Sequence, residues 1–180
     1  MWRVEIVDRS VTEALRRSVL RPHLTADQPM PGDDRPEAVH FAAFAADHEP
    51  GDRGAGEPGR PDDDDRPAST CFLVREAPPW DSADIGAWHL RQMATDPAHR
   101  RQGAGVAVLD SVVAHVAAAG GGRVWCHART VAEGFYAAHG FVTVSGIHPS
   151  GDPPVPHIHM DRTVEPARRQ PIGDPISSNW

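Results

Sequence analysis

Alternating hydrophobic and polar residues mark several short stretches of this 180-residue chain as half-buried β-strands. Near the beginning, Trp2, Val4 and Ile6 alternate with charged residues, which gives a strand over 2–7 one apolar face. Further apolar-rich runs predict strands over 39–44, 69–75, 88–95, 123–127, 141–144 and 156–164. Most of the secondary structure predicted in this way is β.

Three segments carry helix signals. The first opens on a capping-box pattern at 10–13, whose side chains satisfy free amides of a helix start, and Pro22 ends it. The second spans 106–118 and stops at three glycines, 120–122. The third starts at a second capping box and runs over 130–139. The buried stripe of the second helix would consist of Val106, Leu109, Val112, Val113 and Val116. Helices and strands together indicate an α/β protein.

From 49 to 67 the chain consists of Gly, Pro, Asp, Glu and Arg, interrupted only by alanine. Such a composition buries too little apolar surface to fold, so 49–68 is expected to be a disordered, solvated loop inserted between two neighbouring strands. Four consecutive aspartates at 62–65 would repel one another in a coil and hold no fixed ligand geometry, which argues against a metal site there. The rest of the chain is expected to form one domain over 1–164, with a loose tail over 165–180.

Charge and composition exclude some classes of function. The net charge of −7 argues against a nucleic-acid partner and is compatible with a cationic amine substrate. No apolar run approaches the ~18 residues of a membrane helix, and the N-terminus lacks the apolar core of a signal peptide, so a cytoplasmic protein without a membrane partner is expected. The two cysteines, Cys71 and Cys126, indicate neither a disulfide scaffold nor a zinc site.

The most informative stretch is the basic, glycine-paired turn over 100–106, between a predicted strand and the long helix. Two arginines precede the free amides of a helix start, an arrangement suited to a phosphate or pyrophosphate. A P-loop is excluded because the chain has no lysine, and Val108 stands where a dinucleotide-binding fingerprint needs its third glycine. Arg100, Gly103 and Gly105 instead fit the acyl-CoA pyrophosphate pattern Arg/Gln-x-x-Gly-x-Gly/Ala.

The strand before this turn carries a second signal. Trp88 and Leu90 share one face by the period of two, whereas Met93 is out of phase with them. A slip of one residue within a strand predicts a β-bulge, which leaves a backbone group outside the hydrogen-bond ladder. A free strand amide beside an anion site would be able to hold a ligand carbonyl.

Two segments together resemble a known family. Residues 90–105 look like motif A of the GNAT N-acetyltransferase superfamily, and 132–141 look like its motif B, Ala-x-x-Phe-Tyr-x-x-x-Gly-Phe. The resemblance implies the GNAT acyl-CoA acyltransferase fold, a mixed, mostly antiparallel and twisted sheet flanked by helices. In that fold the strands at 87–95 and 122–127 would run parallel and splay apart to admit the cofactor. It also implies acetyl transfer from acetyl-CoA to a primary amine of a small molecule or peptide, by direct attack in a ternary complex.

The resemblance also implies roles for individual residues. Tyr136, at the position of the family's tyrosine, would act as the general acid that protonates the leaving CoA thiolate. Arg129 stands where many members have an asparagine that contacts CoA, and it would contact a phosphate or face solvent. The residues expected to hold pantetheine and the thioester carbonyl are Met93, Ala94 and Thr95. Those expected to hold the pyrophosphate are Arg100, Arg101, Gln102, Gly103, Ala104, Gly105 and Val106.

Several questions stay open in the sequence. His40, His127 and Glu37 lie on or near predicted strands that would line the substrate cleft, but none is assigned as the general base. His157 and His159 share a strand face that suits zinc, yet no third ligand is evident, so no metal is expected. The acceptor amine and the acyl chain length are not identified, and a homodimer would be in keeping with the family. The alternative function is a non-catalytic acyl-CoA sensor or interaction module with the same fold.

Overall fold

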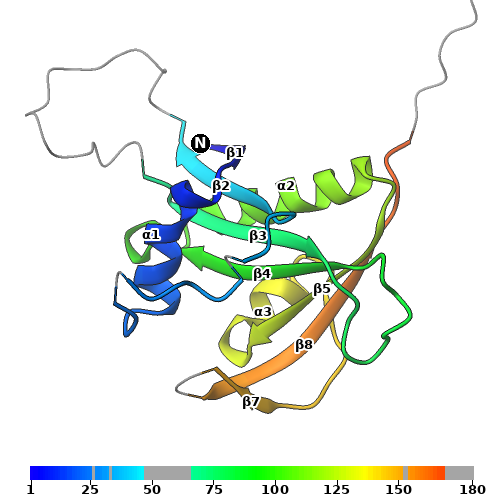
Figure 1. Cartoon of the computed structure of the whole chain (residues 1–180). Coiled ribbons are helices and arrows are strands. Elements are labelled where there is room, and N and C mark those ends of the chain that lie inside the picture. The colour runs from blue at the N-terminus through cyan, green and yellow to red at the C-terminus, as the bar shows by residue number, and fades with distance from the viewer. Residues whose placement is uncertain (26, 33, 47–65, 152–153, 169–180) are drawn as a thin grey trace, which may run out of the picture.

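The computed structural model describes residues 1–25, 27–32, 34–46, 66–151 and 154–168 (Figure 1). Most of the predicted insertion and the end of the predicted tail lie outside these residues. Along the chain the elements are β1 Trp2–Val7, α1 Arg9–Leu20, β2 Val39–Ala45, β3 Ser69–Arg75, β4 Trp88–Thr95, α2 Ala104–Ala118, β5 Gly122–Arg129, α3 Glu133–Ala137, β6 Val142–Thr143, β7 His148–Ser150 and β8 Val155–Val164. Short 3₁₀ turns at Pro97–His99 and Thr130–Ala132 precede α2 and α3.

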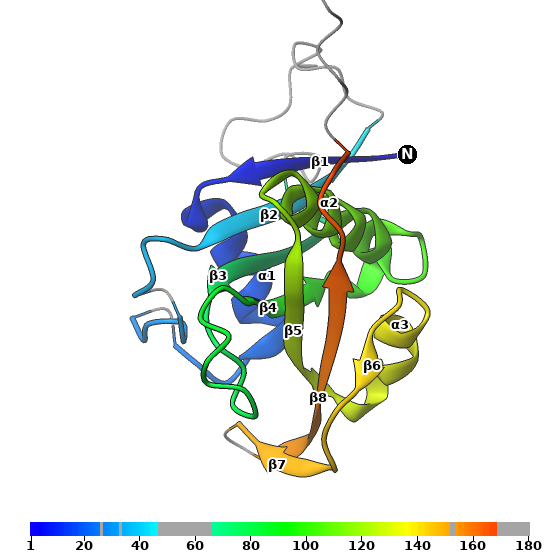
Figure 2. The same cartoon turned by 90° about the vertical axis from the view of Figure 1, so that its right-hand side faces the viewer.

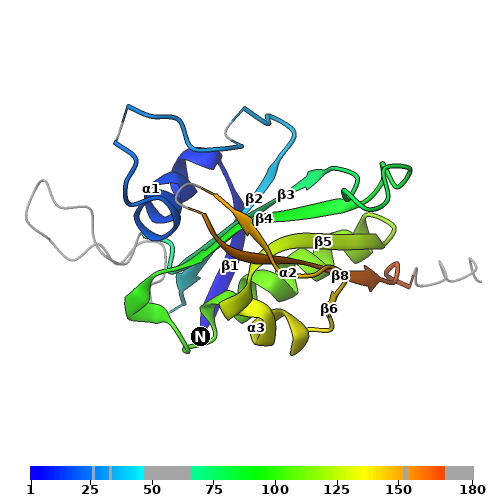
Figure 3. The same ribbon diagram turned by 90° about the horizontal axis from the view of Figure 1, so that it is seen from below.

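The strands form one sheet in the order β1-β2-β3-β4-β5-β8-β6, with β7 paired to the far end of β8. Every neighbouring pair is antiparallel except β4 and β5, which run parallel. Helix α1 lies on one face of the sheet, whereas α2 and α3 lie on the other (Figures 2 and 3). The predicted fold, a mixed and mostly antiparallel sheet flanked by helices, is confirmed. None of the described helices is long and apolar enough to cross a membrane.

The hydrophobic core lies between the sheet and the face of α2. It consists of alternate residues of the central strands, such as Phe41, Leu73 and Leu90, as the period of two requires. The buried residues of α2 are Ala104, Val108, Leu109, Val112 and Val116. The predicted stripe was wrong at Val106, which is 38% exposed. Helix α2 begins at Ala104, and its first buried positions are Ala104 and Val108 rather than Val106.

Neither predicted capping box forms. Helix α1 begins earlier, at the N-cap Asp8, whose carboxylate accepts hydrogen bonds from the amide and the hydroxyl of Ser10 at 2.9 and 2.6 Å. Glu13 instead pairs with an arginine one turn later. Glu133 accepts a hydrogen bond from the Thr143 hydroxyl at 2.7 Å rather than returning to its own helix start. An acidic side chain two residues upstream of Ser10 therefore takes the N-cap position of α1.

The described part of the tail forms a backbone hydrogen bond with the end of α2. The amide of Ala167 donates to the carbonyl of Ala117 at the end of α2, at 2.8 Å. Gly121, which starts the return from α2 into β5, lies directly under this segment. A Cβ on Gly121 would come within 2.5 Å of the Val164 carbonyl oxygen, so only glycine fits this crossing.

Candidate active site

The site is organised by the separation of β4 and β5. These strands pair only from Trp88 with Val124 to Leu90 with Cys126. Beyond those pairs each strand continues for several residues with no partner on the side that faces the other, and the two diverge (Figure 1). The predicted parallel strands that splay apart are therefore present.

The predicted β-bulge lies at the start of this gap. On the β3 side of β4, Thr70 pairs with Ala94 while Phe72 pairs with Arg91, so β4 carries one extra residue. Gln92 takes up the irregularity with a positive φ of 51°. The bulge is confirmed, and it leaves β4 backbone groups directed into the gap rather than into a ladder.

The arginine- and glycine-containing loop follows directly after β4. Arg101 and Gly103 both have positive φ, 61° and 88°, and they turn the chain into α2. The first amides of α2 have no acceptor within the helix, and no side chain caps them. Arg100 and Arg101 are exposed, and no described acidic side chain pairs with either. These free donors and positive charges form a candidate anion site at the end of β4, where the sequence predicts that the pyrophosphate binds.

The loop and the bulge are in close contact. A Cβ built on Gly105 would lie 3.2 Å from the Thr95 hydroxyl and 3.6 Å from the end of the Met93 side chain. A residue far away in the sequence also holds the loop, because the Trp2 indole N–H donates to the Gln102 carbonyl at 2.7 Å. The residues predicted to hold the two ends of one cofactor therefore lie side by side.

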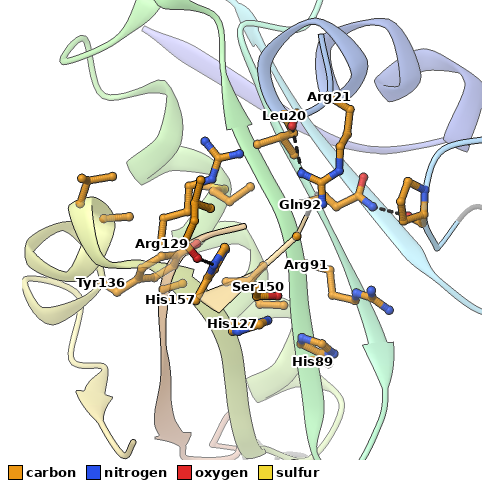
Figure 4. A pocket seen from close by; sticks show the side chains of 18 of the residues that line it. Leu20, Arg21, His89, Arg91, Gln92, His127, Arg129, Tyr136, Ser150 and His157 are labelled. Carbon is orange, nitrogen blue, oxygen red and sulfur yellow. Dashed lines mark hydrogen bonds between the residues drawn. The ribbon is translucent and has the colours of Figure 1, made fainter. Parts of the chain in front are cut away.

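A pocket of about 500 Å³ opens beside the gap (Figure 4). Its walls come from the end of α1 and the segment after it, residues 89–93 of β4, the end of β5, the turn into α3 with Tyr136, and the β7–β8 hairpin. Of the residues predicted for the site, Met93, Arg129 and Tyr136 line this pocket, whereas the loop over 100–106 lies beyond it. The bulge therefore lies between the pocket on one side and the loop over 100–106 on the other.

The comparisons with known proteins agree with this geometry. Residues 76–163 match the family model of the acetyltransferase (GNAT) domain. The chain carries a domain of the GNAT acetyltransferase superfamily. The matched segment contains the bulge, the loop and Tyr136, so the resemblance identified from the two motifs is confirmed. A search of curated protein sequences gave no match.

Solved GNAT structures share the fold at low sequence identity. An aminoglycoside 6'-N-acetyltransferase complexed with coenzyme A superposes with a TM-score of 0.61 at 15% identity, over 93% of this chain and 99% of that one. An acyl-CoA N-acyltransferase from Pseudomonas aeruginosa gives 0.59 at 17% identity, over 90% and 98%. The ribosomal-protein-S18-alanine N-acetyltransferase from Escherichia coli gives 0.59 at 15% identity, over 94% and 97%. At these identities the likeness establishes the fold of this GNAT domain.

Tyr136 is the buried aromatic residue of α3, and its side chain forms part of the pocket wall. Burial, assisted by the nearby thiols of Cys126 and Cys71, raises the pKa of its hydroxyl well above the usual value. No described residue forms a hydrogen bond with this hydroxyl. The phenol is therefore protonated and unpartnered at neutral pH.

The three side chains considered as the general base lie in different surroundings. His40 is buried between β2 and α1, in contact with the Thr12 hydroxyl, and it does not line the pocket. Glu37 is exposed and forms an ion pair with Arg35 at 2.7 Å. Only His127 reaches the pocket.

The sequence analysis missed the pair of His89, which is buried, and Glu76, which is half-buried. The His89 ring stacks on Trp125 with centroids 3.5 Å apart, and its Nδ1 donates to the Glu76 carboxylate at 2.9 Å. Burial lowers the pKa of His89 to about 4, so the ring is neutral and Nε2 retains its lone pair. Period-two alternation after Trp88 would have placed His89 on the polar face, but only the structure shows which residues it meets there.

The pocket of this GNAT domain is basic. The titratable side chains of its wall are Arg21, His23, His89, Arg91, His127, Arg129, Tyr136 and His157. None of the described residues that line it is acidic. Glu76, which lies 3.9 Å from the Arg91 guanidinium, stands behind the wall. Burial, and to a smaller extent the positive charge of the neighbouring Arg129, lower the pKa of Arg21.

Proposed function

We propose that the chain is an acetyl-CoA-dependent N-acetyltransferase that acts on the primary amine of a small molecule. The observation that carries this proposal is the continuity of the site. An anion-binding loop, a strand bulge with free backbone groups and a protonated tyrosine follow one another along the gap between β4 and β5. This order matches a donor with a phosphate end and a thioester end.

The donor would be held mainly by backbone. Amides of Gln102 to Val106 would bind the pyrophosphate, with Arg100 and Arg101 adding charge, since helix-start amides and guanidinium groups bind phosphate strongly. Backbone groups of Met93, Ala94 and Thr95 would bind pantetheine and orient the thioester carbonyl. Acetyl-CoA supplies an acyl group that is already activated, so positioning is the main task of the protein.

Tyr136 would donate its proton to the thiolate that leaves. Two properties support this role: the raised pKa keeps the phenol protonated, and the hydroxyl has no partner among the described residues. Replacing Tyr136 with phenylalanine removes the proton and little else. Loss of a positioned general acid typically lowers kcat by about 10²–10⁴-fold, with coenzyme A affinity preserved.

The charge of the pocket refines the class of acceptor. Net charge alone was compatible with a cationic amine, but Arg21, Arg91 and Arg129 would repel a substrate that carries only positive groups. We infer that the acceptor combines its amine with an acidic group, a carboxylate or a phosphate. A charge-assisted hydrogen bond from an arginine contributes roughly 1.5–3 kcal/mol, enough for at least tenfold discrimination.

The test measures release of the CoA thiol over a panel of amines, in which each amino acid is paired with its uncharged amide. Turnover that favours the acids supports both proposals. The Arg91→Gln variant should reduce that preference, and Arg3→Gln, an exposed arginine on β1, should not. Binding of coenzyme A without turnover of any amine would support the alternative, an acyl-CoA sensor. Absence of any thermal shift with acetyl-CoA or coenzyme A would refute the assignment, and propionyl- and succinyl-CoA test the acyl chain length.

A further inference from the structure

Three histidines from three different strands meet at one end of the pocket. His127 of β5, His148 of β7 and His159 of β8 bring one ring nitrogen each to within 4.8 Å of one another. We call them the imidazole cluster. His127 and His159 are direct neighbours across the β5–β8 ladder, and His148 comes from the short hairpin strand on the other side of β8. Of the pair that the sequence singled out on β8, only His159 belongs to this cluster, and His157 does not.

The geometry of His127 and His148 suits a shared ligand. Their rings are nearly parallel, with 13° between planes, and the centroids are 4.8 Å apart. The two Nε2 atoms are only 2.7 Å apart, so the rings face each other through these nitrogens. The ring of His159 lies 4.8 Å from that of His127 and 4.5 Å from that of His148. One ring nitrogen from each of the three histidines therefore lies within one small volume.

The hydrogen bonds around His148 and His159 leave ring nitrogens of both residues available to bind a metal ion. His148 Nδ1 lies 3.1 Å from the Gly146 carbonyl, to which only an Nδ1–H can donate, and this leaves a lone pair on Nε2. A histidine that binds metal commonly donates its other N–H to a backbone carbonyl in this way. No described group forms a hydrogen bond with either ring nitrogen of His159, which packs against Trp80 with centroids 5.1 Å apart.

We propose that the imidazole cluster binds one divalent transition-metal ion of the zinc class. Tetrahedral coordination at the usual Zn–N length separates ligand nitrogens by about 3.3 Å. The observed separations lie on both sides of this value, so small rotations of the rings would complete the site. His127, which now donates through Nε2 to His148, would carry its hydrogen on Nδ1 instead. That change of tautomer leaves the net charge of the ring unaltered.

Such a site would retain an open coordination position. The described residues provide three imidazoles and no carboxylate or thiolate ligand to the cluster. Three protein ligands with an open fourth position are typical of zinc sites that bind water or substrate, whereas closed sites are structural. Because His127 also lines the pocket, the ion would stand at the pocket wall. The proposal does not depend on acetyl transfer.

The experiment uses zinc alone and the tag-free full chain, stripped with a chelator. Isothermal titration calorimetry should show one zinc ion per chain, and the Tm should rise with zinc. Loss of one of three ligands should weaken binding at least about tenfold in His148→Gln and in His159→Ala. The control is His23→Ala, an exposed histidine that lines the pocket but lies outside the cluster, and its affinity should equal that of the wild type.

Cobalt(II) gives a second measurement that does not depend on the variants folding equally well. The wild-type chain should develop the visible absorption of tetrahedral cobalt, saturating at one equivalent. The proposal is refuted if the wild type neither binds zinc nor gives that spectrum. It is also refuted if both cluster variants bind zinc as tightly as the wild type, or if His23→Ala weakens binding as much as they do.

Discussion

Replacement of Gly103 by alanine should weaken coenzyme A binding beyond any effect on the fold. Gly103 is the N-cap of α2, with a φ of 88° and a ψ of −3°, in the left-handed region. A Cβ there would meet the Trp2 indole at 3.7 Å, an ordinary contact, so no clash contributes. The perturbation is therefore backbone strain at the anion site.

The magnitude follows from two opposing terms. A left-handed conformation costs an L-residue roughly 1–2 kcal/mol. Alanine also restricts the unfolded chain, which returns about 0.4–1 kcal/mol. The net loss of unfolding free energy is about 1 kcal/mol, which in a chain of this length lowers the Tm by about 2–4 °C. Relaxation of the strain would misalign the first amides of α2, and loss of one charge-assisted hydrogen bond corresponds to an affinity about tenfold lower.

Two other glycines serve as controls. Gly120 has a similar φ of 99° with nothing within 4 Å of a Cβ, and it lies at the opposite end of α2. Gly120→Ala should lose the same stability as Gly103→Ala but bind coenzyme A as the wild type does. Gly134, in α3 and without positive φ, also has open space, so Gly134→Ala should lose no stability. Calorimetric titration with coenzyme A and thermal unfolding measure both effects, and equal affinities for Gly103→Ala and Gly120→Ala would refute the role of the Gly103 turn.

Three further predictions concern the frame of the site. Trp2→Phe removes the hydrogen bond to the Gln102 carbonyl and should raise the Kd for coenzyme A by about fivefold, for a loss of about 1 kcal/mol, with kcat at saturation unchanged. Gly121→Ala places a Cβ 2.5 Å from the Val164 carbonyl oxygen, and chemical denaturation should show a loss above about 3 kcal/mol. His89 has a pKa of about 4 when folded and 6.5 when unfolded, so its contribution to stability is complete above pH 6.5 and is lost as the pH falls through 4. That contribution amounts to about 3 kcal/mol. In His89→Asn the free energy of unfolding should therefore depend less on pH between 4 and 6.5 than in the wild type, and an unchanged slope would contradict the prediction.

The bulge and the loop that we propose hold the cofactor were largely predictable from the sequence. The loop is recognised from local features, namely the spacing of its glycines, its paired arginines and the helix that follows. The bulge is recognised from Met93, which is out of phase with Trp88 and Leu90. The errors at this level were also local. The cap of α1 was misassigned because Asp8, two residues before Ser10, takes the N-cap position, and α3 has no side-chain cap at all. Val106 was placed in the core because the start of α2 was predicted two residues too late.

The acceptor half depended on the sheet. Which residue stands opposite which is set by strand order and register, and neither can be read from the spacing of residues along the chain. His127 faces His159 because β8 inserts between β5 and β6, and His89 meets Trp125 because the parallel pairing of β4 with β5 sets these two residues opposite each other. The basic character of the pocket has the same origin, since its arginines and histidines come from the segment after α1 and from β4, β5 and β8, and none of the described residues that line it is acidic.

The sequence by itself therefore determined the family and the fold class, and it located the loop and the bulge that we propose hold the donor, because each is encoded in patterns shorter than one strand–turn–helix unit. Only the tertiary structure decided the charge of the acceptor pocket, the pairing of His89 with Glu76 and the meeting of three imidazoles. These depend on contacts between residues far apart in the chain, which become neighbours when burial of the apolar strand faces fixes the register of the sheet.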